Sequence, residues 1–338
     1  MRSSLLADAP AVREPLHSPV AHVVREGLVE GVHYGSVVVL GDEGEVRFQL
    51  GDIEAACYPR SALKPVQAVA MVRCGLPLDG DLLSLAMGSH SGEEHHLAGA
   101  HRILESAGLT EDDLRNTPDL PYDPAVRDTW VRAGRPPSRL AQNCSGKHAA
   151  MLYLCALNSW PLHTYLDPAH PLQVAIAETV EELTGQRVAR TTADGCGAPL
   201  FAVSLHGLAR AAARIATGAP GTPERRVAEA LRGHPEMASG TGRDVAALMR
   251  AVPGLIAKDG FEGVQTAALP DGRAVAVKIA DGANRARVPV AAAALARAGV
   301  DPVLLGPFTG EPVLGGGRPV GSIRPVDALA RPAVLPAA

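Results

Sequence analysis

A serine and a lysine stand three residues apart in the segment YPRSALKPVQA, residues 58–68. In a helix, side chains at positions i and i+3 share a face, so the amine of Lys64 could reach the hydroxyl of Ser61. A lysine can take the proton of a serine when burial or a neighbouring cation lowers the pKa of its amine. A helix-capping serine followed by a surface lysine has the same spacing, so the two residues alone leave both interpretations open.

Lysine is rare in this chain, and its positions are therefore informative. Only four of the 32 basic residues are lysines, namely Lys64, Lys147, Lys258 and Lys278. Arginine stays protonated near neutral pH, whereas a desolvated lysine can accept a proton. Three of the four lie in polar turns rich in glycine or serine, which favours an enzyme over chance scatter. Lys278 alternates with valines, and we interpret it as a structural strand residue.

Lys258 begins a Lys-Asp-Gly turn beside a predicted strand. Penicillin-recognising serine enzymes combine a Ser-x-x-Lys helix with a Lys-[Ser/Thr]-Gly strand. Asp259 replaces the hydroxyl residue of that second pattern, which weakens the match.

Three histidines occur in MGSHSGEEHH, residues 87–96: His90, His95 and His96. They suggest a metal site, but adjacent residues such as His95 and His96 are not expected to share a helix face. Ser91 and Glu94 instead fit a capping box, so the pattern favours a helix start.

Two further turns, QNCSGKHAAM (142–151) and TADGCGAPLF (192–201), each precede a predicted apolar helix and each carry a cysteine. Cys144 and Cys196 are possible zinc ligands, although structural zinc sites usually show four closely spaced ligands. Lys147 could activate Cys144 as a thiolate or serve as an unusual amine ligand. From the pattern, a substrate-binding turn ranks first, thiol chemistry second and a metal site third.

The elements that position these residues follow a simple order along the chain. Strand patterns occupy 18–52, with a hairpin, and return over 254–282, while amphipathic helices such as 198–218 fill the middle. A last helix is predicted over 283–300. This order predicts an α+β fold whose mixed or antiparallel sheet is assembled from both chain ends. The expected parts are a sheet-containing part (15–80 and 240–310), a mainly helical part (81–239) and an extended tail (311–338).

Composition limits the class of protein. The chain has 338 residues, 46% hydrophobic and 20% charged, as in globular proteins, and its net charge of −4 argues against nucleic acid as a partner. The first 20 residues lack the apolar core of a secretory signal, and no apolar run is long enough to cross a membrane. The five cysteines, an odd number, favour reduced thiols, and we expect a cytoplasmic protein.

Six segments together resemble one family. They are YPRSALKPVQA, GSHSGEEHH, NCSGKHAAM, TADGCGAP, HPEMASGTGR and AKDGFEG. They are similar to the L-asparaginase II family, which is related to the rhizobial inducible, thermolabile L-asparaginase, and the resemblance covers about residues 20 to 300. It implies a fold similar to serine β-lactamases and glutaminases.

The resemblance also implies residue roles. The implied catalytic pairs are Ser61 with Lys64 and Ser89 with Lys258; the implied zinc ligands are Cys144, Lys147 and Cys196, completed by water; the implied substrate-binding residues are Arg60, His148 and Asp194. No organic cofactor is implied, and we expect a homodimer.

The implied reaction is hydrolysis of L-asparagine to L-aspartate and ammonia through an acyl ester on Ser61. On this hypothesis Lys64 deprotonates Ser61, and Ser89 with Lys258 protonates the leaving ammonia. Asp194 holds the substrate ammonium, and zinc orients the pocket rather than generating hydroxide. The alternatives are a glutaminase, a penicillin-recognising serine hydrolase and a catalytically silent amino-acid-binding protein.

Overall fold

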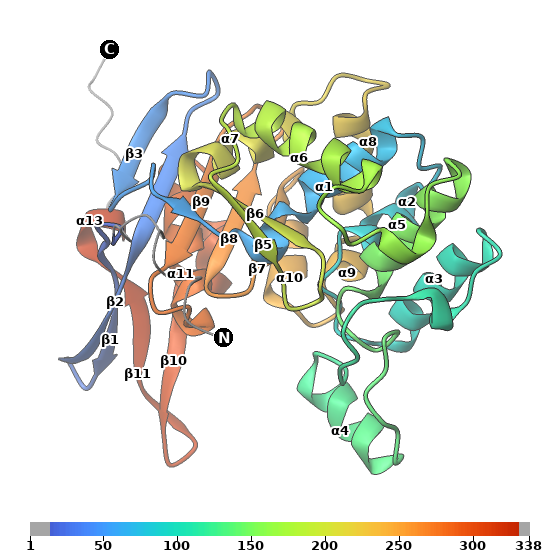
Figure 1. Cartoon of the computed structure of the whole chain (residues 1–338). Coiled ribbons are helices and arrows are strands. Elements are labelled where there is room, and N and C mark those ends of the chain that lie inside the picture. The colour runs from blue at the N-terminus through green and yellow to red at the C-terminus, as the bar shows by residue number, and fades with distance from the viewer. Residues whose placement is uncertain (1–13, 331–338) are drawn as a thin grey trace, which may run out of the picture.

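An eight-stranded antiparallel sheet stands beside a helical part in the computed structural model, which describes residues 14–330 (Figure 1). The strand order is β10-β11-β1-β2-β9-β8-β7, and β3 pairs with β2. The strands are β1 (Ser18–Arg25), β2 (Leu28–Leu40), β3 (Val46–Leu50), β7 (Ile256–Gly260), β8 (Val264–Ala268), β9 (Ala274–Ile279), β10 (Glu311–Gly315) and β11 (Arg318–Pro325). Three strands come from the N-terminal part and five from the C-terminal part, which confirms the predicted α+β class and the sheet assembled from both ends.

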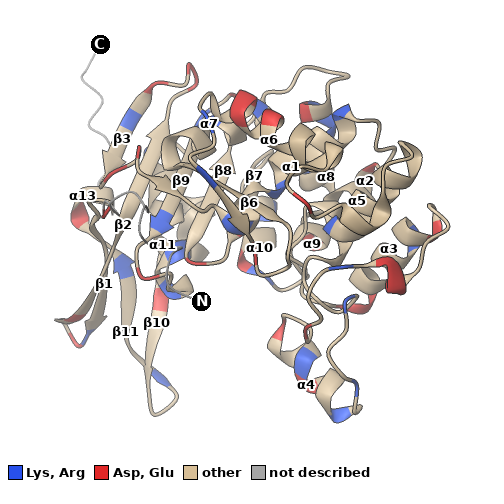
Figure 2. Ribbon diagram, viewed as in Figure 1, with Lys and Arg blue, Asp and Glu red and all other residues tan. Residues whose placement is uncertain are grey.

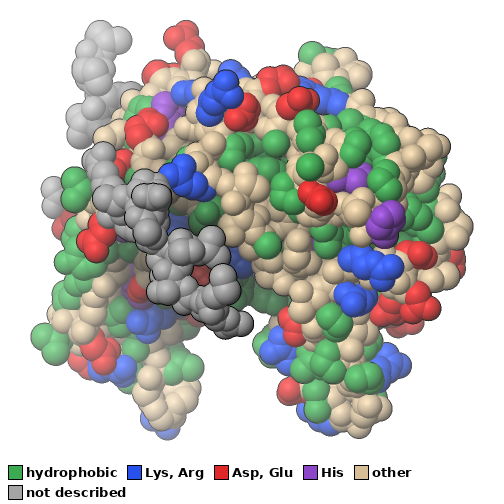
Figure 3. Space-filling model, in the orientation of Figure 1, with side chains coloured by type: hydrophobic (Ala, Val, Ile, Leu, Met, Phe, Trp, Pro, Cys, Tyr) green, Lys and Arg blue, Asp and Glu red, His purple; other side chains and the backbone are tan. Residues whose placement is uncertain are grey.

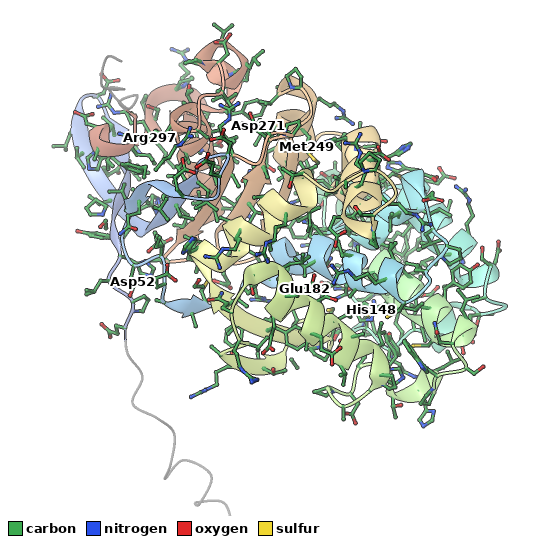
Figure 4. The ribbon with its side chains drawn as sticks, turned by 90° about the horizontal axis from the view of Figure 1, so that it is seen from above. Asp52, His148, Glu182, Met249, Asp271 and Arg297 are labelled. Atoms are coloured by element: carbon green, nitrogen blue, oxygen red, sulfur yellow. The ribbon has the colours of Figure 1, made fainter. Side chains whose placement is uncertain are left out.

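The centre of the sheet is apolar on both faces. The four consecutive residues Val37–Leu40 of β2 are all fully buried, so both sides of this strand are covered. Helix α7 (Leu205–Ala216) and helix α11 (Asn284–Arg297) both pack on β2 and β9, and Figure 4 shows helices on either side of the sheet. The β-branched run in β2 suits such a position, because its side chains pack well on a pleated surface.

The helical part lies next to β7, at one edge of the large sheet (Figure 1). Its remaining helices are α1 (Lys64–Arg73), α2 (Gly80–Ala86), α3 (Glu94–Glu105), α4 (Pro124–Arg132), α5 (Ser145–Leu157), α6 (Pro171–Thr184), α8 (Pro223–Gly233), α9 (Pro235–Ala238) and α10 (Asp244–Ala251), with short 3-10 turns η1 (Arg60–Leu63), η2 (Glu111–Asp113) and η3 (Leu162–Thr164). Basic and acidic residues are spread over both parts of the molecule, and on the face seen in Figure 3 the two signs are interspersed (Figures 2 and 3).

A small second sheet corrects one sequence-based prediction. The helix predicted over 198–218 begins only at Leu205, and the preceding Pro199–Ser204 form strand β6. This strand lies between β4 (Ala56–Cys57) and β5 (Arg190–Ala193). All six residues of β6 are buried, and a short, fully apolar run has no alternation that could distinguish a strand from a helix.

The C-terminal segment continues the large sheet. The predicted tail over 311–338 contains β10, β11 and helix α13 (Asp327–Ala330) in its described portion, preceded by α12 (Pro302–Leu305) and η4 (Gly306–Phe308). The rest of this tail, residues 331–338, lies outside the described residues. Residues 1–13, which belong to the segment considered above for a secretory signal, also lie outside them. Between residues 14 and 330, the helices are all too short or too polar to span a bilayer.

The junction between the two parts is tight where β7 passes η1. A Cβ atom added to Gly260 would lie 2.3 Å from the carbonyl oxygen of Pro59, so only glycine allows this approach. The end of β7 is therefore held against the turn that carries Ser61. Lys258 and Asp259, the two residues before Gly260, are brought to the same junction.

Candidate active site

Ser61 lies in the 3-10 turn η1, one turn before helix α1. The sequence placed it at or beside the helix N-cap, but the N-cap residue is Leu63 and Ser61 makes no capping hydrogen bond. The serine is partly exposed, and among the described residues its hydroxyl has no hydrogen-bonding partner. The residue before it, Arg60, has a φ of +52°, a left-handed conformation that is uncommon outside glycine. The hydroxyl of Ser61 is thus available at a constrained turn.

Lys64 is almost completely buried and pairs with Ser89 rather than with Ser61. Its Nζ donates to the carbonyl oxygen of Gly88, to Ser89 Oγ at 3.1 Å and to Cys144 Sγ at 3.1 Å. Within the described residues, no hydrogen bond joins it to Ser61. A buried amine needs acceptors, and Lys64 finds them on the segment before α3 and at the start of α5.

Lys258 is likewise buried, and its partner is Asp259 rather than Ser89. Its Nζ lies 2.5 Å from Asp259 Oδ1 and donates to the Asp259 carbonyl oxygen at 2.8 Å. Burial lowers the pKa of Lys258 to about 8, although the charge of Asp259 acts in the opposite direction. Burial would raise the pKa of Asp259, but the charges of Lys258 and Arg243 outweigh it and hold that pKa below its usual range.

Arg243 connects the two halves of this cluster. One of its terminal nitrogens donates to the carbonyl oxygen of Ser89 at 3.0 Å, and the other donates to Asp259 Oδ2 at 2.7 Å. The guanidinium also lies over the ring of Tyr122, 4.6 Å from its centroid. The predicted pair of Ser89 and Lys258 is therefore linked through Arg243 and Asp259, and the described residues show no direct hydrogen bond between the two.

Arg60 and Asp194 form an ion pair next to Ser61. Arg60 Nε donates to Asp194 Oδ1 at 2.7 Å, and the backbone N–H of Gly195 donates to the same oxygen at 2.8 Å. Burial would raise the pKa of Asp194, but the charges of Lys147 and Arg60 lower it, so the carboxylate stays ionised. The other carboxylate oxygen has no hydrogen-bonding partner among the described residues, and it can accept a bond from a ligand.

Cys144, Lys147 and Cys196 form a buried cluster that fits a zinc ion by its donor chemistry. Lys147 Nζ lies 3.4 Å from Cys196 Sγ, and the two cysteines share one small apolar cluster. Zinc–sulfur and zinc–nitrogen bonds of about 2.3 and 2.1 Å place neighbouring tetrahedral ligands about 3.6 Å apart, close to this separation. Contact between the two thiols lowers the pKa of Cys196. The same contact, together with burial, raises the pKa of Cys144 to about 12.

His148 lies on α5 in the helical part (Figure 4), directly after Lys147. Its Nδ1 is 2.8 Å from the hydroxyl of Tyr165, which accepts the backbone N–H of Arg115 at 3.1 Å. If the Tyr165 hydroxyl donates to Nδ1, the proton of His148 is on Nε2. That Nε2 is buried without a partner among the described residues, so it can form a hydrogen bond with a bound molecule.

The structure thus joins the sequence-predicted residues in two connected groups. One contains Ser61, Arg60 and Asp194, which are partly exposed or lie near the surface, and the other contains the buried amines with Ser89 and the two cysteines. Sequence reasoning missed Arg243 and Tyr165 and counted Asp259 only as a departure from a motif. Arg243 ends the segment HPEMASGTGR, which supported the resemblance but received no role, whereas no signal pointed to Tyr165.

The family is shown by comparison with known protein families. The L-asparaginase II family model matches residues 21–325, so the chain belongs to the L-asparaginase II family. The predicted resemblance is thereby confirmed over nearly the whole chain. Among curated proteins, the comparison found no match.

Several solved structures are distantly similar. Mglu, in its tris and glutamate form, has 17% identity and a TM-score of 0.34, covering 82% of this chain and 61% of that one, so this chain spans about three fifths of the length of Mglu. A β-lactamase from Mycobacterium bovis has 14% identity and a TM-score of 0.40, covering 74% and 88% of the two chains. EstCE1, a hydrolase with promiscuous acyltransferase activity, has 14% identity and a TM-score of 0.39, covering 74% and 91%.

Proposed function

We propose that this protein hydrolyses the side-chain amide of L-asparagine, giving L-aspartate and ammonia through an acyl ester on Ser61. Membership of the L-asparaginase II family supports an amidohydrolase. The observation that carries the proposal is the Ser61 hydroxyl, which has no partner among the described residues and lies in η1, against which β7 packs with the buried Lys258. Lys64 and Ser89 extend this buried set of polar groups. A nucleophile with a proton relay is what acyl transfer requires.

The ion pair of Arg60 and Asp194 suits the two charges of an amino acid. The oxygen of Asp194 that has no partner among the described residues would accept the substrate ammonium, and the terminal nitrogens of Arg60 would bind its carboxylate. The side-chain amide would then extend toward Ser61, the residue after Arg60. Nε2 of His148 would be a further hydrogen-bonding atom for the substrate.

In the proposed reaction, Ser61 attacks the amide carbon and its proton enters the network of buried amines. We assign the acceptor role to Lys258, because a pKa of about 8 leaves a fraction of this amine neutral near pH 7. We assign the donor role to Lys64, because its amine already donates to Ser89 Oγ. The sequence-based hypothesis gave Lys64 the acceptor role. After ammonia leaves, water attacks the ester and its proton returns to Lys64, while Lys258 gives its proton back to the Ser61 oxygen as aspartate is released.

Cys144, Lys147 and Cys196 would hold the zinc ion that the family resemblance implies. Bound there, the ion would supply a fixed positive charge that orders the pocket. The nucleophile in this proposal is Ser61, and no step depends on the metal. A cytoplasmic location and a homodimer remain predictions from the sequence.

The test is ammonia release from L-asparagine and L-glutamine, together with ring opening of a β-lactam followed by absorbance, each measured with the purified protein and with Ser61→Ala. We expect turnover of asparagine, and a loss of at least about a thousandfold in Ser61→Ala, as for other activated-serine enzymes. Near-normal turnover in this variant would refute the acyl ester on Ser61. Preference for glutamine or for the β-lactam would assign the substrate to one of the alternative enzymes, and turnover of none would indicate a binding protein.

A further inference from the structure

A second cluster of potential metal ligands lies at the start of α3, apart from the cysteine cluster. It consists of Glu93, His95 and His96, which each offer one ligand atom within 4.8 Å of the other two. The adjacency of the two histidines argued against a shared site in the sequence. In the structure their ring centroids are 4.0 Å apart, and Glu93, in the extended conformation before the helix, completes the group.

The strongest observation in this cluster is the state of His96. Its side chain is fully buried, and its Nε2 lies 2.9 Å from the carbonyl oxygen of Glu236. A carbonyl oxygen can only accept a hydrogen bond, so Nε2 carries the ring proton and Nδ1 carries the lone pair. That Nδ1 is buried with no hydrogen-bonding partner in the described part of the chain. Metal-binding histidines characteristically donate their other N–H to a backbone carbonyl or a carboxylate, as His96 does.

The carboxylate of Glu93 is fixed in place by Thr241. One oxygen accepts the backbone N–H of Thr241 at 3.0 Å, and the other accepts its hydroxyl at 2.6 Å. Each oxygen keeps a second lone pair for a cation. His95 is close, with Nδ1 3.8 Å from Glu93 Oε2. The start of α3 carries a partial positive charge, which the carboxylates of Glu93 and Glu94 oppose.

We propose that Glu93, His95 and His96 bind a divalent first-row transition-metal ion such as zinc, with water completing its coordination. Imidazole nitrogen together with a carboxylate oxygen suits zinc, nickel, cobalt and copper better than magnesium or calcium. The ion strengthens the connection between the start of α3 and the segment 236–241. Hydrogen bonds of His96 with Glu236 and of Glu93 with Thr241 already join these two parts. Its role is structural: it holds the start of α3 against a segment that also positions Ser89, since the Ala238 carbonyl oxygen of that segment accepts the backbone N–H of Ser89.

Cobalt(II) distinguishes this site from the cysteine cluster, because only thiolate ligands give intense charge-transfer absorption. The experiment titrates chelator-treated full-length protein with cobalt(II). It follows the charge-transfer absorption of thiolate ligands and, separately, the ligand-field absorption of the metal. We compare the natural sequence with His95→Asn, Glu93→Gln and the matched control His101→Asn, whose histidine is exposed on the same helix.

We expect the ligand-field absorption that lacks thiolate character to require about ten- to a hundredfold more cobalt in His95→Asn and Glu93→Gln. It should be unchanged in His101→Asn. Zinc should raise the melting temperature of the natural protein and of His101→Asn more than that of His95→Asn, because the ion binds only the folded state. Equal binding by all variants, or an equal loss in His101→Asn, would overturn the site. So would complete loss of cobalt absorption in Cys144→Ser, since the cysteines would then hold all the metal.

Discussion

Replacing Asp259 with asparagine isolates the proposed proton-acceptor role of Lys258. The substitution keeps a side-chain oxygen near Nζ but removes the negative charge that lies 2.5 Å from it. That charge raises the pKa of Lys258, while burial, Lys64 and Arg243 lower it to about 8. Removal of the carboxylate therefore lowers this pKa further, and the remaining charge of Arg243 acts in the same direction.

The size of the shift can be estimated from the general Coulomb energy of a close ion pair. Two unit charges about 4 Å apart interact by about 4 kcal/mol at an effective dielectric constant near 20, which corresponds to about 3 pKa units. Arg243 shares the carboxylate at 2.7 Å, so part of its charge is already neutralised. We therefore expect a decrease of roughly 1–3 units, the range found for a single opposite charge. The pKa of Lys258 would then lie at roughly 5–7.

The assay is the pH dependence of kcat/KM for ammonia release from asparagine. In the natural protein the rate should rise with pH through about 8, as the Lys258 amine becomes neutral. In Asp259→Asn this limb should move to lower pH, even if the maximal rate also falls. An unshifted limb, or one that moves to higher pH, would refute the role of Lys258.

The contribution of Lys258 to the stability of the fold does not mask this rise. The pKa of Lys258 is about 8 in the folded protein and about 10.4 in an unfolded chain. Between these values the unfolded chain binds more protons, so the contribution of this group to stability increases with pH. A melting curve at each pH serves as the control, and a rate change that follows unfolding would be recognised by it.

Three further predictions concern the neighbouring residues. Arg243→Gln should lower kcat at least about tenfold with little change in KM, because it releases the Ser89 backbone and Asp259 together; unchanged steady-state kinetics would contradict this. Arg60→Lys should raise KM for asparagine about tenfold or more, since an ammonium cannot hold Asp194 and a carboxylate in the same fork geometry, and an unchanged KM would exclude that contact. Cys144→Ser should reduce the zinc bound per chain, measured by elemental analysis, and an equal content would remove Cys144 from the zinc ligands.

Much of the fold was predictable because its signals are local. The valine run of β2 and the apolar face of α11 follow standard periodicities, and the two groups of strands could only form a sheet by pairing across the helical middle. Strand β6 was missed because its burial comes from tertiary packing, which leaves no alternation in the sequence. The capping box predicted for Ser91 and Glu94 was also wrong: the N-cap is Glu93, and the Ser91 hydroxyl is buried without a partner in the described residues.

The chemistry-bearing residues were predictable by type, but their pairings were not. A spacing of three residues places Ser61 and Lys64 together only if both lie in one regular helix. The chain instead forms a 3-10 turn before α1, and the buried amine turns to acceptors 24 to 80 residues away, at Gly88, Ser89 and Cys144. Long-range contacts of this kind leave no trace in local spacing. The family resemblance identified the candidate site residues. Which of them form hydrogen bonds with one another depends on their burial and tertiary packing.

Different acceptors explain why Lys64 and Lys258 can take different roles although they are the same residue type. Both amines are almost completely buried, and each lowers the free energy of its charged form only through the acceptors around it. Lys64 donates hydrogen bonds to the Gly88 carbonyl, the Ser89 hydroxyl and the Cys144 thiol, none of which carries a carboxylate charge. Lys258 contacts the carboxylate of Asp259, and Arg243 shares that carboxylate, so its stabilising effect on the lysine is divided. A lysine whose carboxylate partner is shared releases its proton more readily. Arg243, by sharing Asp259, therefore helps Lys258 to act as the base.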